Sequence, residues 1–96
     1  LTAAQSKLEK GKIDNLMKIA STSPKDLAAS IKEYIPAKLD KTWFGMSEDA
    51  KSGMAMSIAI RASQAMKLAG SDGKHMPYSV AMKLAANQIL KEHNKK

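Results

Sequence analysis

The sequence is poor in the residues that supply cross-links and reactive groups to a small protein. It contains no cysteine, which excludes disulfide bonds, thiolate metal ligands and a thiol nucleophile. This absence, with no charged start followed by an apolar run, is compatible with the cytoplasm or another reducing compartment. The longest apolar-or-small run, residues 53–60, is far shorter than the roughly 20 residues that span a bilayer. We therefore expect no membrane segment.

Aromatic and β-branched residues are also scarce. Only four of the 96 residues are aromatic, and valine occurs once, at Val80. The core must then come from alanine, methionine, isoleucine and leucine, which pack well between helices and poorly between sheets. No segment alternates apolar and polar residues as a strand does. The sequence predicts an all-α fold, a small bundle of four main helices in a single domain over residues 1–96. Because the chain opens on Leu1, we interpret it as an excised domain or a processed chain.

The first two helices are expected over residues 2–20 and 24–35. In the first, Gly11 costs about 1 kcal/mol relative to alanine, so we expect it to split the helix or to leave residues 1–11 frayed. In the second, Ser23 is a good N-cap and Pro24 suits the first helical position. A proline at position 36 is expected to end this helix.

The third and fourth helices are expected over residues 47–69 and 77–93. A short helical turn should precede them at residues 36–45. The third helix has Ser47 as its N-cap, and its many alanines let neighbouring helices approach closely, so we expect it to be the central helix. On a helical wheel, Met56, Ile60 and Leu68 project from its otherwise polar side. They are expected to meet a second neighbour in the bundle or to form an exposed partner interface.

The chain is strongly basic, with a formal net charge of +7, and lysine supplies all but one of its 16 basic side chains. Lysine attracts phosphates but reads base edges poorly, whereas arginine can do both. The charge indicates either a polyanion-binding surface or simply a well-solvated protein. For the first alternative, the candidate nucleic-acid contacts are Lys38, Lys41, Trp43, Lys74, Lys91, Lys95 and Lys96. The last two belong to a basic tail, residues 94–96.

Trp43 and Phe44 form an adjacent aromatic pair that follows two of these lysines. Exposed aromatic rings among lysines are typical of surfaces that bind single-stranded nucleic acid. The competing interpretation, which we favour, is that the two largest apolar side chains of a small domain anchor its core. A helix-turn-helix over residues 13–35 fits in length, but its second helix lacks arginine or glutamine to read bases.

No pattern of catalytic or metal-binding residues is present. His75 and His93 lie far apart without a carboxylate at metal-ligand spacing. Residues 70–74, GSDGK, have too few residues between the glycines for a phosphate-binding P-loop. The adjacent acids Glu48 and Asp49 point about 100° apart on a helix and suit its first turn. We therefore expect no enzyme, no metal, no cofactor and no small-molecule substrate.

Two functions remain open at this point. The first is a non-catalytic module that binds nucleic acid, DNA more than RNA, through its phosphate backbone and with weak sequence specificity. The alternative is a helical protein-interaction or oligomerisation domain, with a protein partner or a homodimer formed through Met56, Ile60 and Leu68.

Overall fold

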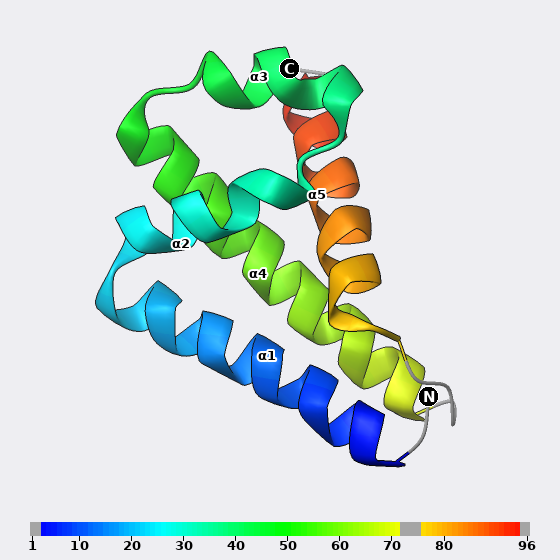
Figure 1. The fold of residues 1–96 in the computed structure, drawn as a ribbon. Coiled ribbons are helices and arrows are strands. Elements are labelled where there is room, and N and C mark those ends of the chain that lie inside the picture. The colour runs from blue at the N-terminus through cyan, green and yellow to red at the C-terminus, as the bar shows by residue number, and fades with distance from the viewer. Residues whose placement is uncertain (1–2, 72–75, 95–96) are drawn as a thin grey trace.

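The computed structural model of the protein describes residues 3–71 and 76–94, and all regular secondary structure in this part of the chain is helical, without a strand. The all-α class is confirmed, but the described residues form five α-helices rather than four, arranged as Figure 1 shows. The α-helices are α1 (Ala3–Thr22), α2 (Pro24–Ile31), α3 (Asp40–Phe44), α4 (Glu48–Ser71) and α5 (Tyr78–Asn94). Two short 3₁₀ helices, η1 (Lys32–Tyr34) and η2 (Ala37–Leu39), connect α2 to α3.

Helix α1 runs without a break through Gly11, so the predicted split at this glycine is wrong. Ile13, Leu16 and Ala20 are buried on one side of α1, where the helix packs against α2 and α4. Burial of such side chains is worth more than the roughly 1 kcal/mol that one glycine costs in a helix. Tertiary packing therefore holds the helix together across this position.

Helix α2 ends at Ile31, four residues earlier than predicted, and continues as the 3₁₀ turn η1. The last turn tightens into 3₁₀ geometry, as is common at the ends of α-helices, and Pro36 keeps the residue before it out of helical backbone. Ile35 is accordingly extended, with φ −74° and ψ 125°. Pro24 occupies the first helical turn as predicted, but the side chain of Ser23 makes no capping hydrogen bond.

Helix α3 forms where a single helical turn was expected, and its side chains fix one end of the bundle. Trp43 is 2% exposed and Leu39 is also buried. The hydroxyl of Thr42 lies 2.9 Å from the Oδ1 of Asn94, at the end of α5. Gly45 closes α3 in right-handed backbone, with φ −79°, and its N–H donates to the carbonyl of Lys41.

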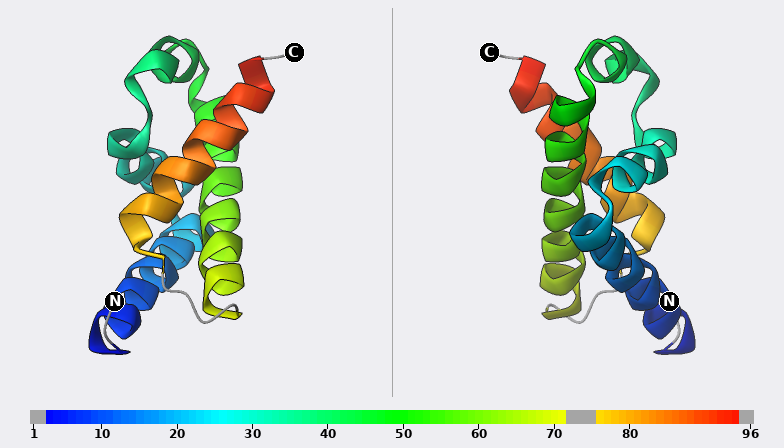
Figure 2. Two further views of the ribbon diagram at one scale, coloured as in Figure 1. Left: turned by 90° about the vertical axis from the view of Figure 1, so that its right-hand side faces the viewer. Right: turned by 90° about the vertical axis from the view of Figure 1, so that its left-hand side faces the viewer.

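Helix α4 lies at the centre of the fold and packs against α1, α2 and α5. Figure 2 shows α5 crossing α4 on one side, with α1 and α2 on another. The predicted N-cap is confirmed, because the N–H of Ala50 donates to the Oγ of Ser47 at 3.2 Å. The buried faces of the α4–α5 pair are rich in alanine, whose small side chain permits close helix packing. The fully or almost fully buried alanines are Ala55, Ala59 and Ala62 on α4 and Ala81, Ala85 and Ala86 on α5.

The start of α5 is held by a side chain from α1. The carboxylate of Glu9 accepts a hydrogen bond from the backbone N–H of Tyr78 at 2.8 Å. The ring of Tyr78 meets that of Tyr34 edge-on, with ring centroids 5.7 Å apart. Among the described helices, none is long and apolar enough to cross a membrane.

Candidate nucleic-acid interface

Phe44, the last residue of α3, is an exposed aromatic side chain flanked by lysines. Its exposed fraction is 52%. The ammonium groups of Lys32, in η1, and Lys51, in the first turns of α4, each lie 5.6 Å from the centroid of its ring. Distances below about 6 Å are those of cation–π contacts. Three elements within one 20-residue stretch, from Lys32 to Lys51, thus place two positive charges over a ring that is half exposed.

The local geometry of α3 explains why one aromatic residue is buried and its neighbour is not. Successive residues on a helix point about 100° apart, so Trp43 fills the core while Phe44 turns out of it. The expectation that both side chains anchor the core is therefore right for Trp43 and wrong for Phe44. Trp43 must also be removed from the candidate nucleic-acid contacts, because an indole that is 2% exposed offers no face for a base.

Of the predicted lysine contacts, three lie at the same end of the bundle as Phe44. Lys41 lies three residues before Phe44, on the same side of α3, and Lys38 lies in η2. Lys91 lies one turn before Asn94, whose contact with Thr42 joins the end of α5 to α3 (Figure 1). All three lysines are exposed. The other predicted contacts, Lys74, Lys95 and Lys96, lie outside the described residues.

Lys32 and Lys51 were not predicted as part of this surface. In the sequence, only Pro36 bears on the position of Lys32, because this proline ends the helical segment that precedes α3. Lys51 also lies 3.7 Å from the carboxylate of Glu48, and its side chain is 18% exposed. Lys32 is exposed. Lys32 is therefore the more accessible of the two cations beside the ring.

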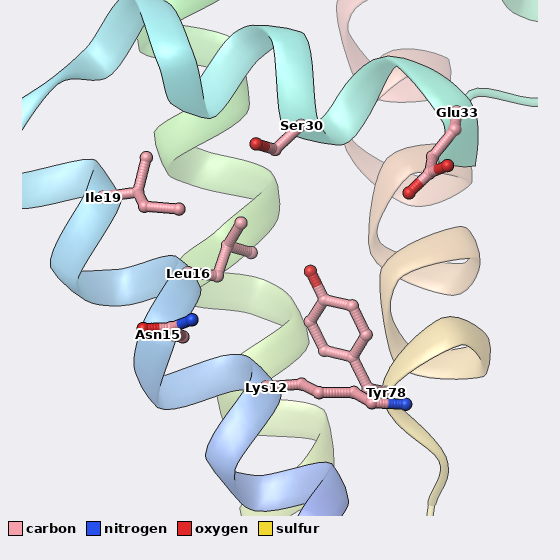
Figure 3. Close-up of a pocket in the computed structure, with 7 residues that line it drawn as sticks. All are labelled: Lys12, Asn15, Leu16, Ile19, Ser30, Glu33 and Tyr78. Atoms are coloured by element: carbon pink, nitrogen blue, oxygen red, sulfur yellow. The ribbon is translucent and has the colours of Figure 1, made fainter.

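A separate hollow of about 290 Å³ opens between α1, α2, η1 and α5 (Figure 3). The hydroxyl of Tyr78 points toward the segment that carries Ser30 and Glu33. Two polar groups at the rim already have partners, because Ser30 donates to the carbonyl of Asp26 at 3.0 Å and Lys12 lies 3.7 Å from Glu9. The hollow is lined by Lys12, Asn15, Leu16, Ile19, Ser30, Glu33 and Tyr78. We assign no substrate to it.

Burial changes the acidity of the tyrosine pair beside this hollow. Desolvation, followed by the nearby Tyr34 and the carboxylate of Glu33, raises the pKa of Tyr78 to about 12. The pKa of Tyr34 is also raised, first by desolvation and then by Glu33. Both hydroxyls therefore keep their protons at neutral pH and act there as hydrogen-bonding groups.

The predicted partner interface on the central helix is open to solvent. Met56, Ile60 and Leu68 are 37%, 43% and 69% exposed, respectively. Of the two alternatives left open by the sequence, these values agree with an exposed patch, since none of the three side chains is buried against a second neighbour in the bundle. Arg61, at the rim of the apolar face of α4, reaches Gln88 on α5, with its Nη1 3.5 Å from the Oε1.

Within residues 3–71 and 76–94, no group of three or more histidine or acidic side chains is placed to hold a metal ion. Comparison of the chain with protein-family models, with curated proteins and with solved structures gave no match. The functional assignment therefore rests on the arrangement of its own residues.

Proposed function

We propose that this protein is a non-catalytic nucleic-acid-binding module that holds the phosphate backbone through lysines and stacks an unpaired base on Phe44. The observation that carries the proposal is the exposed Phe44 ring with the ammonium groups of Lys32 and Lys51 each 5.6 Å from its centroid. Aromatic rings set among cations are the usual platform for single strands, because the ring stacks on a base while the cations attract phosphates.

The surrounding charge fits the same ligand. Lys38 and Lys41 lie beside or close to Phe44 in the sequence, and Lys91 lies near α3 through the Thr42–Asn94 contact. Lysine ammonium groups neutralise phosphates without reading bases. We therefore expect weak sequence specificity and a preference for unpaired over duplex segments, because pairing and stacking cover the base faces that Phe44 needs.

The proposal is tested by fluorescence anisotropy with a deoxythymidine oligonucleotide of about 20 nucleotides, longer than one typical binding site. A duplex and an RNA of equal length are measured in parallel over a salt series. Log K for the single strand should fall with log salt by about 0.7 for each phosphate neutralised. Salt-independent affinity, or no binding to any of the three, would falsify the proposal.

Variants separate stacking from charge. Phe44→Ala should weaken single-strand binding by about 1–3 kcal/mol, which is about 5- to 150-fold in affinity, with little effect on the duplex. Lys41→Gln should reduce the salt slope by about 0.7. Leu8→Ala is the matched control, because Leu8 is also an exposed apolar side chain but lies on α1. Equal losses for Phe44→Ala and Leu8→Ala would argue against a stacking site.

A second candidate function is protein interaction or oligomerisation. The exposure of Met56, Ile60 and Leu68 on α4 supports it, since exposed apolar groups often mark partner surfaces. Sedimentation of the isolated protein tests the homodimer. A dimer that Met56→Asp or Ile60→Asp dissociates would support this function, whereas a monomer at all concentrations leaves only a different protein as partner.

A further inference from the structure

The contact between Arg61 and Gln88 shows which residues of α4 and α5 lie opposite each other. The two side chains meet at 3.5 Å from opposite helices. The helices are joined by a short connection and run in opposite directions, as their colours show in Figure 1. A step toward the end of α4 therefore corresponds to a step toward the start of α5.

Three exposed apolar side chains lie beyond the Arg61–Gln88 contact, toward the end of α4 and the start of α5. Leu68 lies seven residues after Arg61, hence on the same side of α4, whereas Leu84 lies one turn before Gln88 on α5. Val80 lies one further turn before Leu84. Their exposed fractions are 69%, 40% and 49% for Leu68, Leu84 and Val80. We call these three residues, on the outer side of the α4–α5 pair, the α4–α5 strip.

The charges that α4 and α5 themselves carry along the strip have one sign. From Ala50 to Ser71, and again from Tyr78 to Lys91, the sequence contains no aspartate or glutamate. The same segments contain five cations: Lys51, Arg61, Lys67, Lys83 and Lys91. Arg61 lies at one end of the strip, and Lys67 and Lys83 are exposed neighbours of Leu68 and Leu84 in the sequence. An apolar strip with cationic surroundings is complementary to an apolar surface with acidic flanks.

We propose that the α4–α5 strip docks an acidic amphipathic helix of another protein. Such a helix presents apolar residues at positions i, i+3 or i+4 and i+7 to Leu68, Val80 and Leu84, with glutamates or aspartates along its flanks. The proposal rests on the second candidate function, protein interaction, and gives the chemistry of the partner.

The same observations disfavour other occupants. A second copy bound through this strip by a two-fold axis would place cations such as Lys67 and Lys83 against a like-charged surface. An anionic membrane is a poorer fit, because helices that lie in the membrane interface usually insert tryptophan or phenylalanine. Helix α4 has no aromatic residue, and the only aromatic residue of α5, Tyr78, packs against Tyr34.

The test uses a fluorescein-labelled synthetic peptide with leucines at the i, i+3, i+4 and i+7 positions and glutamates elsewhere, titrated with the full chain. We expect saturable binding that the double variant Leu68→Ser/Leu84→Ser weakens at least tenfold. Leu8→Ser is the matched control, because Leu8 is also an exposed leucine but lies on α1. Equal weakening by Leu8→Ser, or no binding of the peptide, overturns the proposal.

Charge is tested separately. Lys67→Glu/Lys83→Glu should weaken binding of the peptide more than Lys10→Glu/Lys18→Glu, which changes the net charge equally but on α1. Equal losses in the two double variants mean non-specific attraction and overturn the proposal. Two further outcomes would also overturn the proposal. One is self-association that Leu68→Ser/Leu84→Ser abolishes, and the other is binding to phosphatidylserine-containing vesicles that is tighter than binding to the peptide.

Leu68→Ser/Leu84→Ser should leave oligonucleotide affinity unchanged, so this test and the test of Phe44 can fail independently.

Discussion

The carboxylate of Glu9, on α1, lies 2.8 Å from the backbone nitrogen of Tyr78, the first residue of α5. The first N–H groups of a helix have no partner within the helix, and a negative charge there also meets the positive end of the helix dipole. Here that partner comes from a residue 69 positions away in the sequence. The start of α5 therefore depends on the packing of α1.

Replacing Glu9 should destabilise the whole fold. Glu9→Ala removes the cap of α5, and we expect the free energy of unfolding to fall by about 0.5–2 kcal/mol, the range of capping substitutions. The free energy of unfolding is measured by urea denaturation, with circular dichroism as the signal. Asp14→Ala is the control, because Asp14 is an exposed acid on the same helix and both variants gain the helix propensity of alanine. A loss no larger than that of Asp14→Ala would contradict the capping role.

Gly11→Ala should stabilise the protein. Gly11 lies inside α1, and a Cβ atom added there would meet no other atom within 4 Å. Alanine is favoured over glycine in a helix interior by about 0.5–1 kcal/mol, so the urea midpoint should rise by a corresponding amount. Gly45→Ala should not give this gain, because its Cβ would lie 3.0 Å from the carbonyl oxygen of Lys41. An equal gain at both positions would contradict the expected difference between Gly11 and Gly45.

The protein should lose stability above pH 10 in a way that depends on Tyr78. Its pKa in the folded protein is about 12, raised mainly by burial, against about 10 in the unfolded chain. Between these values the unfolded chain releases its proton first, so stability is retained below pH 10 and falls as the pH rises toward 12. Tyr78→Phe removes the ionisable hydroxyl and with it this pH-dependent loss of stability. Between about pH 9 and pH 11, the urea midpoint of the variant should therefore fall less than that of the parent protein. Lysine titration is common to both proteins, so parallel pH profiles would contradict the prediction.

Nucleic-acid binding should leave the fluorescence of Trp43 almost unchanged. Trp43 is the only tryptophan and is 2% exposed, so a stacked base on Phe44 does not reach the indole. Acrylamide should also quench it poorly, before and after an oligonucleotide is added. Strong quenching by the oligonucleotide would show that the indole, rather than Phe44 alone, contacts the bases.

The helical class could be predicted from the sequence because it follows from local properties, namely residue composition and helix capping. Ser47 was correctly assigned as an N-cap, and the scarcity of aromatic and β-branched residues correctly indicated helices. The end of α2 was misplaced because apolar spacing continues to Ile35, whereas residues 32–34 form a 3₁₀ turn and Pro36 keeps Ile35 out of helical backbone. The continuity of α1 across Gly11 depends on packing against α2 and α4, and this packing cannot be derived from the helix propensity of single residues.

The candidate site was predictable only in part for the same reason. Its lysines could be selected by charge, but which of them gather around α3 depends on contacts such as Thr42–Asn94, 52 residues apart. The choice between Trp43 and Phe44 depends on which residue of a five-residue helix faces the core. Composition favoured burial of both side chains, and only the orientation of α3 separates them.

The uneven exposure of the methionines has a consequence for oxidation. All seven lie in described segments; Met56 is 37% exposed and Met82 is fully buried. Peroxide converts methionine to a polar sulfoxide at a rate that follows access to the sulfur. Mild oxidation should therefore modify Met56 first and make the outer side of α4 more polar, while Met82 and the core packing around it stay intact.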